Sequence, residues 1–348
     1  MLLSVSDARQ RLLTAFAPLD TVHAPLTQAT GRVLAEALVS RQDYPSFSNS
    51  SMDGFALRAE DVQRASTGNP VTLTVVADIL AGRPSGVTLQ PGETARIMTG
   101  APLPVGADAV VPVEDTDFDL RDPGMAAPKR VKILRAVESG AYVRPKGGDI
   151  CAGQKVISAG KKLHPQDIGM LAMLGFANVS VYRRPLVGVL STGDELLPVG
   201  APPEPGKIYE SNAHTLSALI EGAGGKTLHL GIAQDRAEAV QERFDRAAEA
   251  GVDLIVSSAG VSVGAFDYVR SAVKANGALD FWRVNMRPGG FHLLGCLATR
   301  CRRLLGLRCL CARHYVRCLE SLAGSASPGG EYYWRMSRRM GGRATCVR

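Results

Sequence analysis

Cysteine is almost absent from most of this sequence. Of the seven cysteines in 348 residues, Cys151 alone lies among the first 290. This scarcity argues against a disulfide framework and favours a reducing compartment, so we expect a cytoplasmic protein. No run of about 18 apolar residues occurs, and Asp7 and Arg9 interrupt the amino terminus before a signal-peptide core could form. The sequence therefore predicts no membrane-spanning helix and no secretion signal.

Lysine and aspartate are missing from residues 291–348. This tail holds 11 of the chain's 40 Lys and Arg, two of its 33 acidic residues and six of its seven cysteines. The formal net charge of +7 therefore belongs to the tail, because residues 1–290 contain 29 basic and 31 acidic side chains. The charge of the body gives no indication of a nucleic-acid partner.

Three interpretations of the tail compete. A zinc site would use Cys309, Cys311, His314 and Cys318, which supply four ligands but no familiar paired CxxC motif. A nucleic-acid arm would explain the arginines, but such arms normally include lysine and avoid clustered cysteine. We favour the third interpretation, in which the coding frame changes near residue 290, because an out-of-frame reading of GC-rich DNA yields this composition.

From residue 186 onward, short apolar runs alternate with helical patterns of 10–15 residues. This alternation predicts right-handed crossovers and a doubly wound, mainly parallel sheet. The expected fold is therefore α/β in this part of the chain. Strands are predicted at 186–192, 226–232, 253–258 and 279–285, and helices at 211–225, 236–251 and 267–277.

Polar motifs follow each of these four strands. Ligands of such sheets bind beyond the carboxyl ends of the strands, which makes these motifs a candidate site. The third motif is rich in glycine and serine and precedes a helix, so its backbone N–H groups and hydroxyls could hold a phosphate. The residues of this loop that suit a phosphate are Ser257, Ser258, Gly260, Ser262 and Gly264.

Three acidic residues reach the same edge of the predicted sheet. Glu195, Asp235 and Asp267 follow the first, second and third strands. Carboxylates and phosphate coexist best with a divalent cation between them, so these residues are candidate Mg²⁺ ligands. Asp267 lies beside its helix start and fits a helix cap equally well.

The first 180 residues have a different pattern. Strands are predicted at 71–80, 108–116 and 130–137 and helices at 4–17 and 165–176, with turn-rich segments between them. Together with the α/β part they indicate a small β-rich domain and an elongated helical and β region. We expect the elongated region at 1–42 and 138–180, the β-rich domain at 43–137, the α/β domain at 181–290 and the aberrant Arg- and Cys-rich tail at 291–348.

Five motifs, taken in order, resemble those of one family. They are NSSMDGFA (49–56), RIMTGAPLPVGADAVV (96–111), GGDI (147–150), STGDEL (191–196) and SSAGVSVGAFDYV (257–269). This series is similar to that of the MoeA family of molybdopterin molybdenumtransferases, to which the carboxy-terminal domain of gephyrin also belongs. The resemblance covers about residues 1–290. After Gly290 the sequence contains none of the motifs that mark the family's further strands and its carboxy-terminal β domain.

The resemblance implies a late step of molybdenum cofactor synthesis. In that step molybdate and adenylylated molybdopterin are bound, AMP is released and the metal stays on the dithiolene. It implies Mg²⁺ as cofactor and catalytic roles for Asp53, Glu195, Asp235 and Asp267. Besides the Gly/Ser loop, the ligand-binding positions implied by the family are Thr99, Asp149, Ser191, Thr192, Gly193, Asp194 and Arg287.

The same resemblance implies a homodimer whose cleft is completed by the partner subunit, and a possible contact with the adenylyltransferase that acts before it. Two alternatives stay open at this point. The chain could be an enzyme of the adenylyltransferase type, since the STGDE and SSAGVSVG motifs are shared in kind with those enzymes. It could also be a non-catalytic scaffold of the gephyrin kind.

Overall fold

The computed structural model describes residues 4, 7, 10, 11, 14, 16–83, 85–118, 125–258, 268–283, 291–297 and 304–307. The chain divides into two compact units. One combines Met1–Ala37 with Ile157–Arg348, and the other is Leu38–Val156. No helix in the described part of the chain is both long and apolar enough to cross a membrane.

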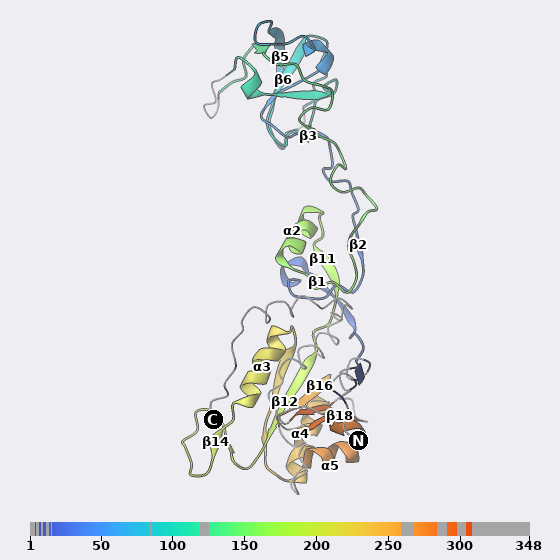
Figure 1. The fold of residues 1–348 in the computed structure, drawn as a ribbon, viewed down its shortest axis with the longest axis vertical. Helices are drawn as coiled ribbons and strands as arrows, with labels where there is room; N and C mark the ends of the chain where they lie inside the picture. Colours follow the sequence, from blue (N-terminus) through green and yellow to red (C-terminus); the bar gives the residue numbers. More distant parts are fainter. Residues whose placement is uncertain are drawn as a thin grey trace. The chain divides into compact units, whose positions relative to one another are not determined.

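The first unit begins with elements that lie far apart in the sequence. Strand β1 (Thr21–Pro25) pairs antiparallel with β11 (Asn178–Tyr182). The short helix η1 (Leu26–Gln28) and helix α2 (Pro165–Met173) adjoin this ribbon (Figure 1). Residues 7, 10, 11 and 14 are helical, within the helix predicted at 4–17. The helix predicted at 165–176 is confirmed as α2.

The larger part of this unit is a six-stranded sheet in the order β15-β12-β16-β19-β18-β17. Parallel pairing joins β15, β12, β16 and β19, while β18 is antiparallel to both of its neighbours, so five of the six strands run in one direction. The predicted doubly wound, mainly parallel sheet is therefore confirmed. Its strands are β12 (Leu186–Thr192), β15 (Lys226–Ala233), β16 (Leu254–Ser257), β17 (Gly277–Arg283), β18 (Phe291–Leu297) and β19 (Leu304–Leu307).

Three helices connect these strands, namely α3 (Asn212–Gly222), α4 (Ala237–Glu249) and α5 (Tyr268–Asn276). The chain crosses from β12 to β15 in one direction and from β15 back past β12 to β16 in the other. Right-handed crossovers then place α3 and α4 on opposite faces of the sheet. Helices α4 and α5 share one core with the sheet, built around Phe244, Val273, Leu190 and Ile255.

Two segments of the tail belong to this sheet. Strands β18 and β19 both lie after residue 290, and β19 pairs with β16. No strand was predicted from the sequence for these segments. Both are apolar runs, FHLLGCL and LLGL, which fit a pleated surface and satisfy the free edge of β16. The candidate zinc ligands Cys309, Cys311, His314 and Cys318 lie outside the described residues.

The second unit is built on a five-stranded sheet in the order β7-β4-β6-β5-β8. Strand β4 alternates between two cores: Phe55 and Leu57 face one, and Ala56 faces the other. Both faces of the sheet are therefore covered at this strand, which explains why β4 is buried throughout. The strands of this sheet are β4 (Gly54–Leu57), β5 (Val71–Ile79), β6 (Glu93–Ile97), β7 (Ala109–Pro112) and β8 (Arg130–Ile133).

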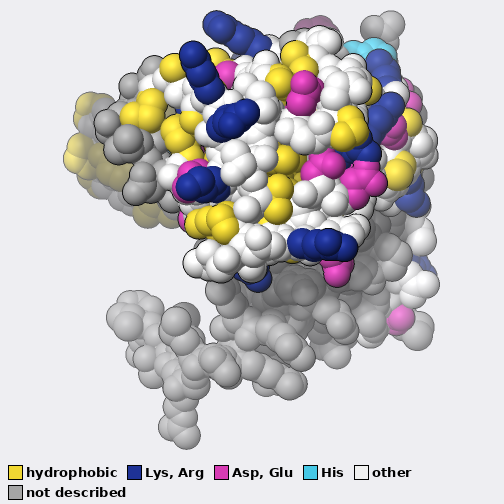
Figure 2. All heavy atoms as spheres, turned by 90° about the horizontal axis from the view of Figure 1, so that it is seen from above, with side chains coloured by type: hydrophobic (Ala, Val, Ile, Leu, Met, Phe, Trp, Pro, Cys, Tyr) yellow, Lys and Arg dark blue, Asp and Glu magenta, His cyan; other side chains and the backbone are white. Residues whose placement is uncertain are grey.

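Shorter elements complete the fold. In the second unit β3 (Asn49–Ser50) pairs with β9 (Val143–Arg144), and η2 (Ala59–Val62) and η3 (Val113–Asp115) are single turns. Strand β2 (Leu38–Val39) pairs with β10 (Lys155–Ile157), and in the first unit β13 (Leu196–Leu197) pairs with β14 (Ile208–Tyr209). The face in Figure 2, seen from the end where Figure 1 labels β5 and β6, mixes both charges with apolar side chains. This face therefore presents no continuous field of one sign.

Candidate active site

The carboxyl ends of β12 and β16 meet where the winding of the sheet reverses. The connection after β12 leads toward β15, and the connection after β16 leads the opposite way, so these two strands flank the topological switch point at which doubly wound sheets bind their ligands. Leu190 is paired with Ser257 in the parallel register, and this brings the following residues, Ser191 and Ser258, side by side. Their hydroxyl oxygens are 3.4 Å apart. Two predicted ligand-binding residues therefore meet at this switch point.

A third residue joins this pair and was not predicted from the sequence. Glu210 is buried between β14 and α3. Its Oε1 atom accepts a hydrogen bond from the Ser191 hydroxyl at 2.9 Å and one from the Ala213 backbone N–H at 2.7 Å. The available signal was an acidic residue directly before a helix start, a position at which a carboxylate can accept bonds from the first free N–H groups.

The loop after β12 depends on a glycine. Gly193 has a φ of +144°, in the region that favours glycine, and a Cβ at this position would collide with the carboxylate of Glu195. Its backbone N–H donates to the Ala233 carbonyl at the end of β15 at 3.2 Å. The loop is thus attached to the neighbouring strand, and Glu195 lies folded back over it.

This attachment brings the acidic residues of two strand ends together. The Asp235 N–H donates to Oδ1 of Asp194 at 3.3 Å. Burial raises the pKa of Asp235 above its ordinary value, and the neighbouring charges of Asp194 and Glu195 raise it further. Carboxylates that repel one another in this way favour a bound cation or a proton. The predicted convergence of Glu195 and Asp235 is therefore present.

Oxygen donors of this kind fit Mg²⁺. Among the residues that the structure describes, no group of three or more His, Cys, Asp or Glu side chains could hold a metal ion alone. Mg²⁺ commonly takes one or two carboxylates and completes its shell with water and substrate phosphates. Glu195 and Asp235 fit that arrangement.

The remaining predicted residues of this unit divide into two groups. Thr192 and Ser257 are buried at the ends of their strands, with Ser257 fully enclosed. Both residues are therefore packed within the sheet at this edge and are not exposed to solvent. Five predicted residues lie outside the described part of the chain, namely Gly260, Ser262, Gly264, Asp267 and Arg287.

The second unit brings two further predicted residues together. Oδ1 of Asp53 accepts hydrogen bonds from both the backbone N–H and the hydroxyl of Thr99, each at 2.7 Å. Both residues are exposed. The motifs MDGFA and MTGAPLP are thus joined at their exposed polar residues, Asp53 and Thr99.

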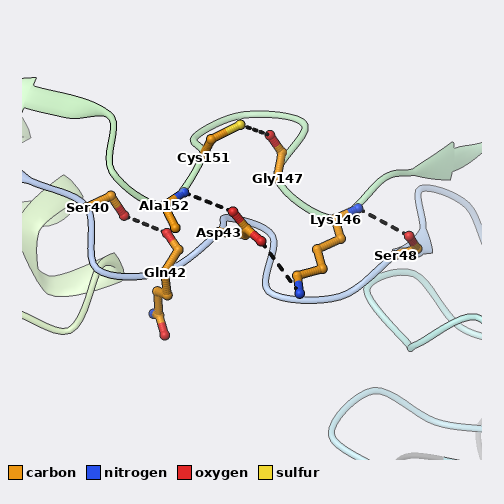
Figure 3. Close-up of polar contacts among 8 residues, drawn as sticks. All are labelled: Ser40, Gln42, Asp43, Ser48, Lys146, Gly147, Cys151 and Ala152. Carbon is orange, nitrogen blue, oxygen red and sulfur yellow. Dashed lines mark hydrogen bonds and ion pairs between the residues drawn. The ribbon is translucent and has the colours of Figure 1, made fainter.

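Asp149 makes a different contact, an ion pair with Arg144 at 2.5 Å in which both side chains are half exposed. The segment that carries it is held by Asp43 (Figure 3). Asp43 accepts from the Ala152 N–H at 2.9 Å and pairs with the Lys146 ammonium at 3.5 Å. These contacts lower the pKa of Asp43, the Ala152 bond most of all.

Comparison with known proteins agrees with this arrangement. Residues 3–175 match the model of the MoeA N-terminal region (domain I and II), and residues 188–325 match that of a probable molybdopterin binding domain. The molybdopterin molybdenumtransferase of Haemophilus influenzae is 35% identical over 289 residues, which cover 83% of this chain and 68% of that protein. The chain belongs to the MoeA family.

Other MoeA relatives support the assignment. The molybdopterin molybdenumtransferase of a Nostoc species is 41% identical over 271 residues. The crystal structure of a MoeA protein from Pyrococcus horikoshii is 28% identical, with a TM-score of 0.79 over 93% of this chain and 81% of that one. The aligned part spans 60% of the Nostoc protein and 65% of a Mycobacterium tuberculosis relative, less than two thirds of either length.

Proposed function

We propose that this chain is a molybdopterin molybdenumtransferase that acts in molybdenum cofactor biosynthesis. The substrates would be molybdate and adenylylated molybdopterin, and AMP would be released. The observation that carries the proposal is the meeting of Asp194, Glu195 and Asp235 beside Ser191 and Ser258, at the point where a doubly wound sheet binds its ligands.

The roles of the individual residues follow from their chemistry. The Ser258 hydroxyl suits a phosphate oxygen, and the family's Gly/Ser loop, with Gly260, Ser262 and Gly264, would add backbone N–H donors. Glu195 and Asp235 would hold Mg²⁺, with Asp267 as a third ligand. When bound, this ion would neutralise charge on the phosphate oxygens of the bond that breaks. Arg287 would contact the anionic ligand.

Three further predicted ligand residues lie in the second unit. Asp53, whose carboxylate is fixed by Thr99, offers an acceptor to a ligand N–H or hydroxyl. We assign Asp53, Thr99 and Asp149 to a cleft that a homodimer completes, as the family resemblance implies. A transient contact with the adenylyltransferase would deliver the reactive substrate. The single cysteine of the first 290 residues is in keeping with the cytoplasm as the site of this step.

Substitution of the two carboxylates tests the proposal. Asp235→Asn and Glu195→Gln remove charge at nearly constant size, so each should lower molybdate-dependent AMP release by about tenfold or more while the fold is kept. Asp245→Asn is the matched control, because Asp245 is an exposed carboxylate on α4 that accepts a bond from the neighbouring Gln241 side chain at 2.9 Å.

The same assay separates the alternatives. An enzyme of the adenylyltransferase type would consume ATP and be indifferent to molybdate, and a scaffold would release no AMP under either condition. Wild-type turnover in both carboxylate variants would contradict the assignment of these residues.

A further inference from the structure

Glu210 is a buried carboxylate that no motif of the predicted site includes. Its residue exposure is 6%, and that of its partner Ser191 is 1%. Burying a charged group is costly unless hydrogen bonds compensate for the lost water. Here the Ser191 hydroxyl and the Ala213 N–H converge on the same oxygen. The carboxylate thus links the start of α3 to the end of β12.

Capping of α3 does not by itself account for this arrangement. Ser211 occupies the N-cap position of α3, where a serine side chain normally accepts a bond from the first turn, but it makes no such bond. Glu210, one residue earlier, takes that bond and reaches the Ser191 hydroxyl as well. A cap alone would require neither the buried position nor the second bond.

The direction of these hydrogen bonds follows from the chemistry of the groups. The Ser191 hydroxyl donates to the Glu210 carboxylate oxygen, so the Ser191 proton points to Glu210. The Ser191 oxygen is then left as an acceptor, and the Ser258 hydroxyl donates to it over 3.4 Å. A bond of that length is weak, so the Ser258 proton can turn to another acceptor at little cost.

We propose that Glu210 is a positioning residue: it fixes Ser191 as an acceptor and thereby makes Ser258 the hydroxyl that donates to a substrate phosphate oxygen. This inference rests on the proposed function for the identity of the substrate. Without Glu210 the Ser191 hydroxyl would be free to rotate. Its proton could then point toward the Ser258 hydroxyl, and the orientation of Ser258 would be lost.

A double-mutant cycle tests this. Glu210→Ala and Ser191→Ala should each lower kcat/KM for AMP release by about tenfold, and the double variant should lose about tenfold rather than a hundredfold, because both changes remove one coupled arrangement. Ser258→Ala should lose at least as much as either, chiefly through KM. Glu210→Gln should stay within about threefold of wild type, since its amide oxygen can accept both bonds.

Glu221→Gln is the matched control. Glu221 also lies on α3 and also accepts from a hydroxyl, that of Thr227 at 2.8 Å, but it is exposed at the other end of the helix. It should leave kcat/KM unchanged. Ser191→Ala does not touch the α3 cap, so it tests the proposal even if Glu210→Ala destabilises the helix.

The outcomes are distinct. Losses that multiply in the double variant, a wild-type Ser191→Ala enzyme, or a Glu210→Gln variant as poor as Glu210→Ala would overturn the positioning role. If the wild-type chain releases no AMP, the proposed function fails, and AMP binding measured by calorimetry on the same variants decides the inference. Coupled losses of AMP affinity would support the positioning role of Glu210 without the proposed function. Independent losses, or no AMP binding, would overturn the positioning role.

Discussion

Asp253 offers the sharpest test of how the fold supports the site. It lies just before β16 with 5% exposure, and its carboxylate accepts two bonds from the Arg183 guanidinium, at 2.7 and 2.8 Å, and one from the Leu186 N–H at 2.8 Å. Leu186 is the first residue of β12. One carboxylate therefore aligns the starts of the two strands whose far ends carry Ser191 and Ser258.

We expect Asp253→Asn to destabilise the α/β unit. The amide keeps the size of the side chain but turns an NH₂ group toward the Arg183 guanidinium and removes the charge that pairs with it. The Arg183 side chain is 35% exposed, so water compensates for part of this loss, and we expect a cost of about 1–3 kcal/mol. That is a sizeable part of a typical domain stability of about 5–15 kcal/mol, and it corresponds to a fall in melting temperature of about 2–12 °C.

Hydrogen exchange at the β12 and β16 amides is the appropriate assay, because it reports the opening of this unit separately from the other. Arg135→Gln is the control, since it breaks an exposed pair with Asp115 whose atoms are 3.8 Å apart and should cost at most about 1 kcal/mol. The reasoning is refuted if Asp253→Asn lowers protection no more than Arg135→Gln does, or if it lowers protection equally in the second unit.

Three further predictions follow from particular residues. Because the pKa of Asp235 is raised, its contribution to stability is complete below the ordinary aspartate value of about 3.9 and is lost as pH rises through the raised value. The free energy of urea unfolding of Asp235→Asn should therefore rise relative to that of wild type as pH increases. For Asp43→Asn, at a residue with a lowered pKa, it should fall relative to wild type. Both assignments are contradicted if the two variants show the same pH dependence as wild type. Gly54→Ala should abolish folding of the five-stranded sheet, visible as lost amide protection in β4 and β7, because its Cβ would collide with the Val111 carbonyl oxygen of the adjacent strand. Finally, if the coding frame changes near residue 290, a frame-restored chain should be more soluble and release AMP faster than this one, and equal behaviour would count against the frame change.

Periodicity was sufficient to predict the elements that carry the site. The strand predicted at 186–192 is β12 with the same bounds, and the helix predicted at 236–251 is α4, one or two residues shorter at each end. Strands β18 and β19 were missed because composition dominated the interpretation of the tail. The pairing of β1 with β11 was missed because local patterns contain no information about a partner more than 150 residues away.

The residues of the site also divide into those that local sequence patterns predict and those that depend on distant partners. Glu195 and Asp235 were predictable because parallel strands deliver their following residues to one edge. Glu210 was not, because it follows a two-residue strand, β14, that has too few residues to show a period. Its role depends on the Ser191 hydroxyl 19 positions earlier, a relation that only the folded chain reveals.

The second unit is inserted into the first, since Leu38–Val156 is continuous while the other unit is assembled from both sides of it. During synthesis the inserted unit can complete its sheet as soon as β8 has left the ribosome. Strand β1 must wait for β11, because Thr21 pairs with Tyr182, 161 residues later. At about 5–20 residues per second, the ribosome needs roughly 8–30 s to supply that partner. Strand β1 therefore stays without its partner on the nascent chain for that time.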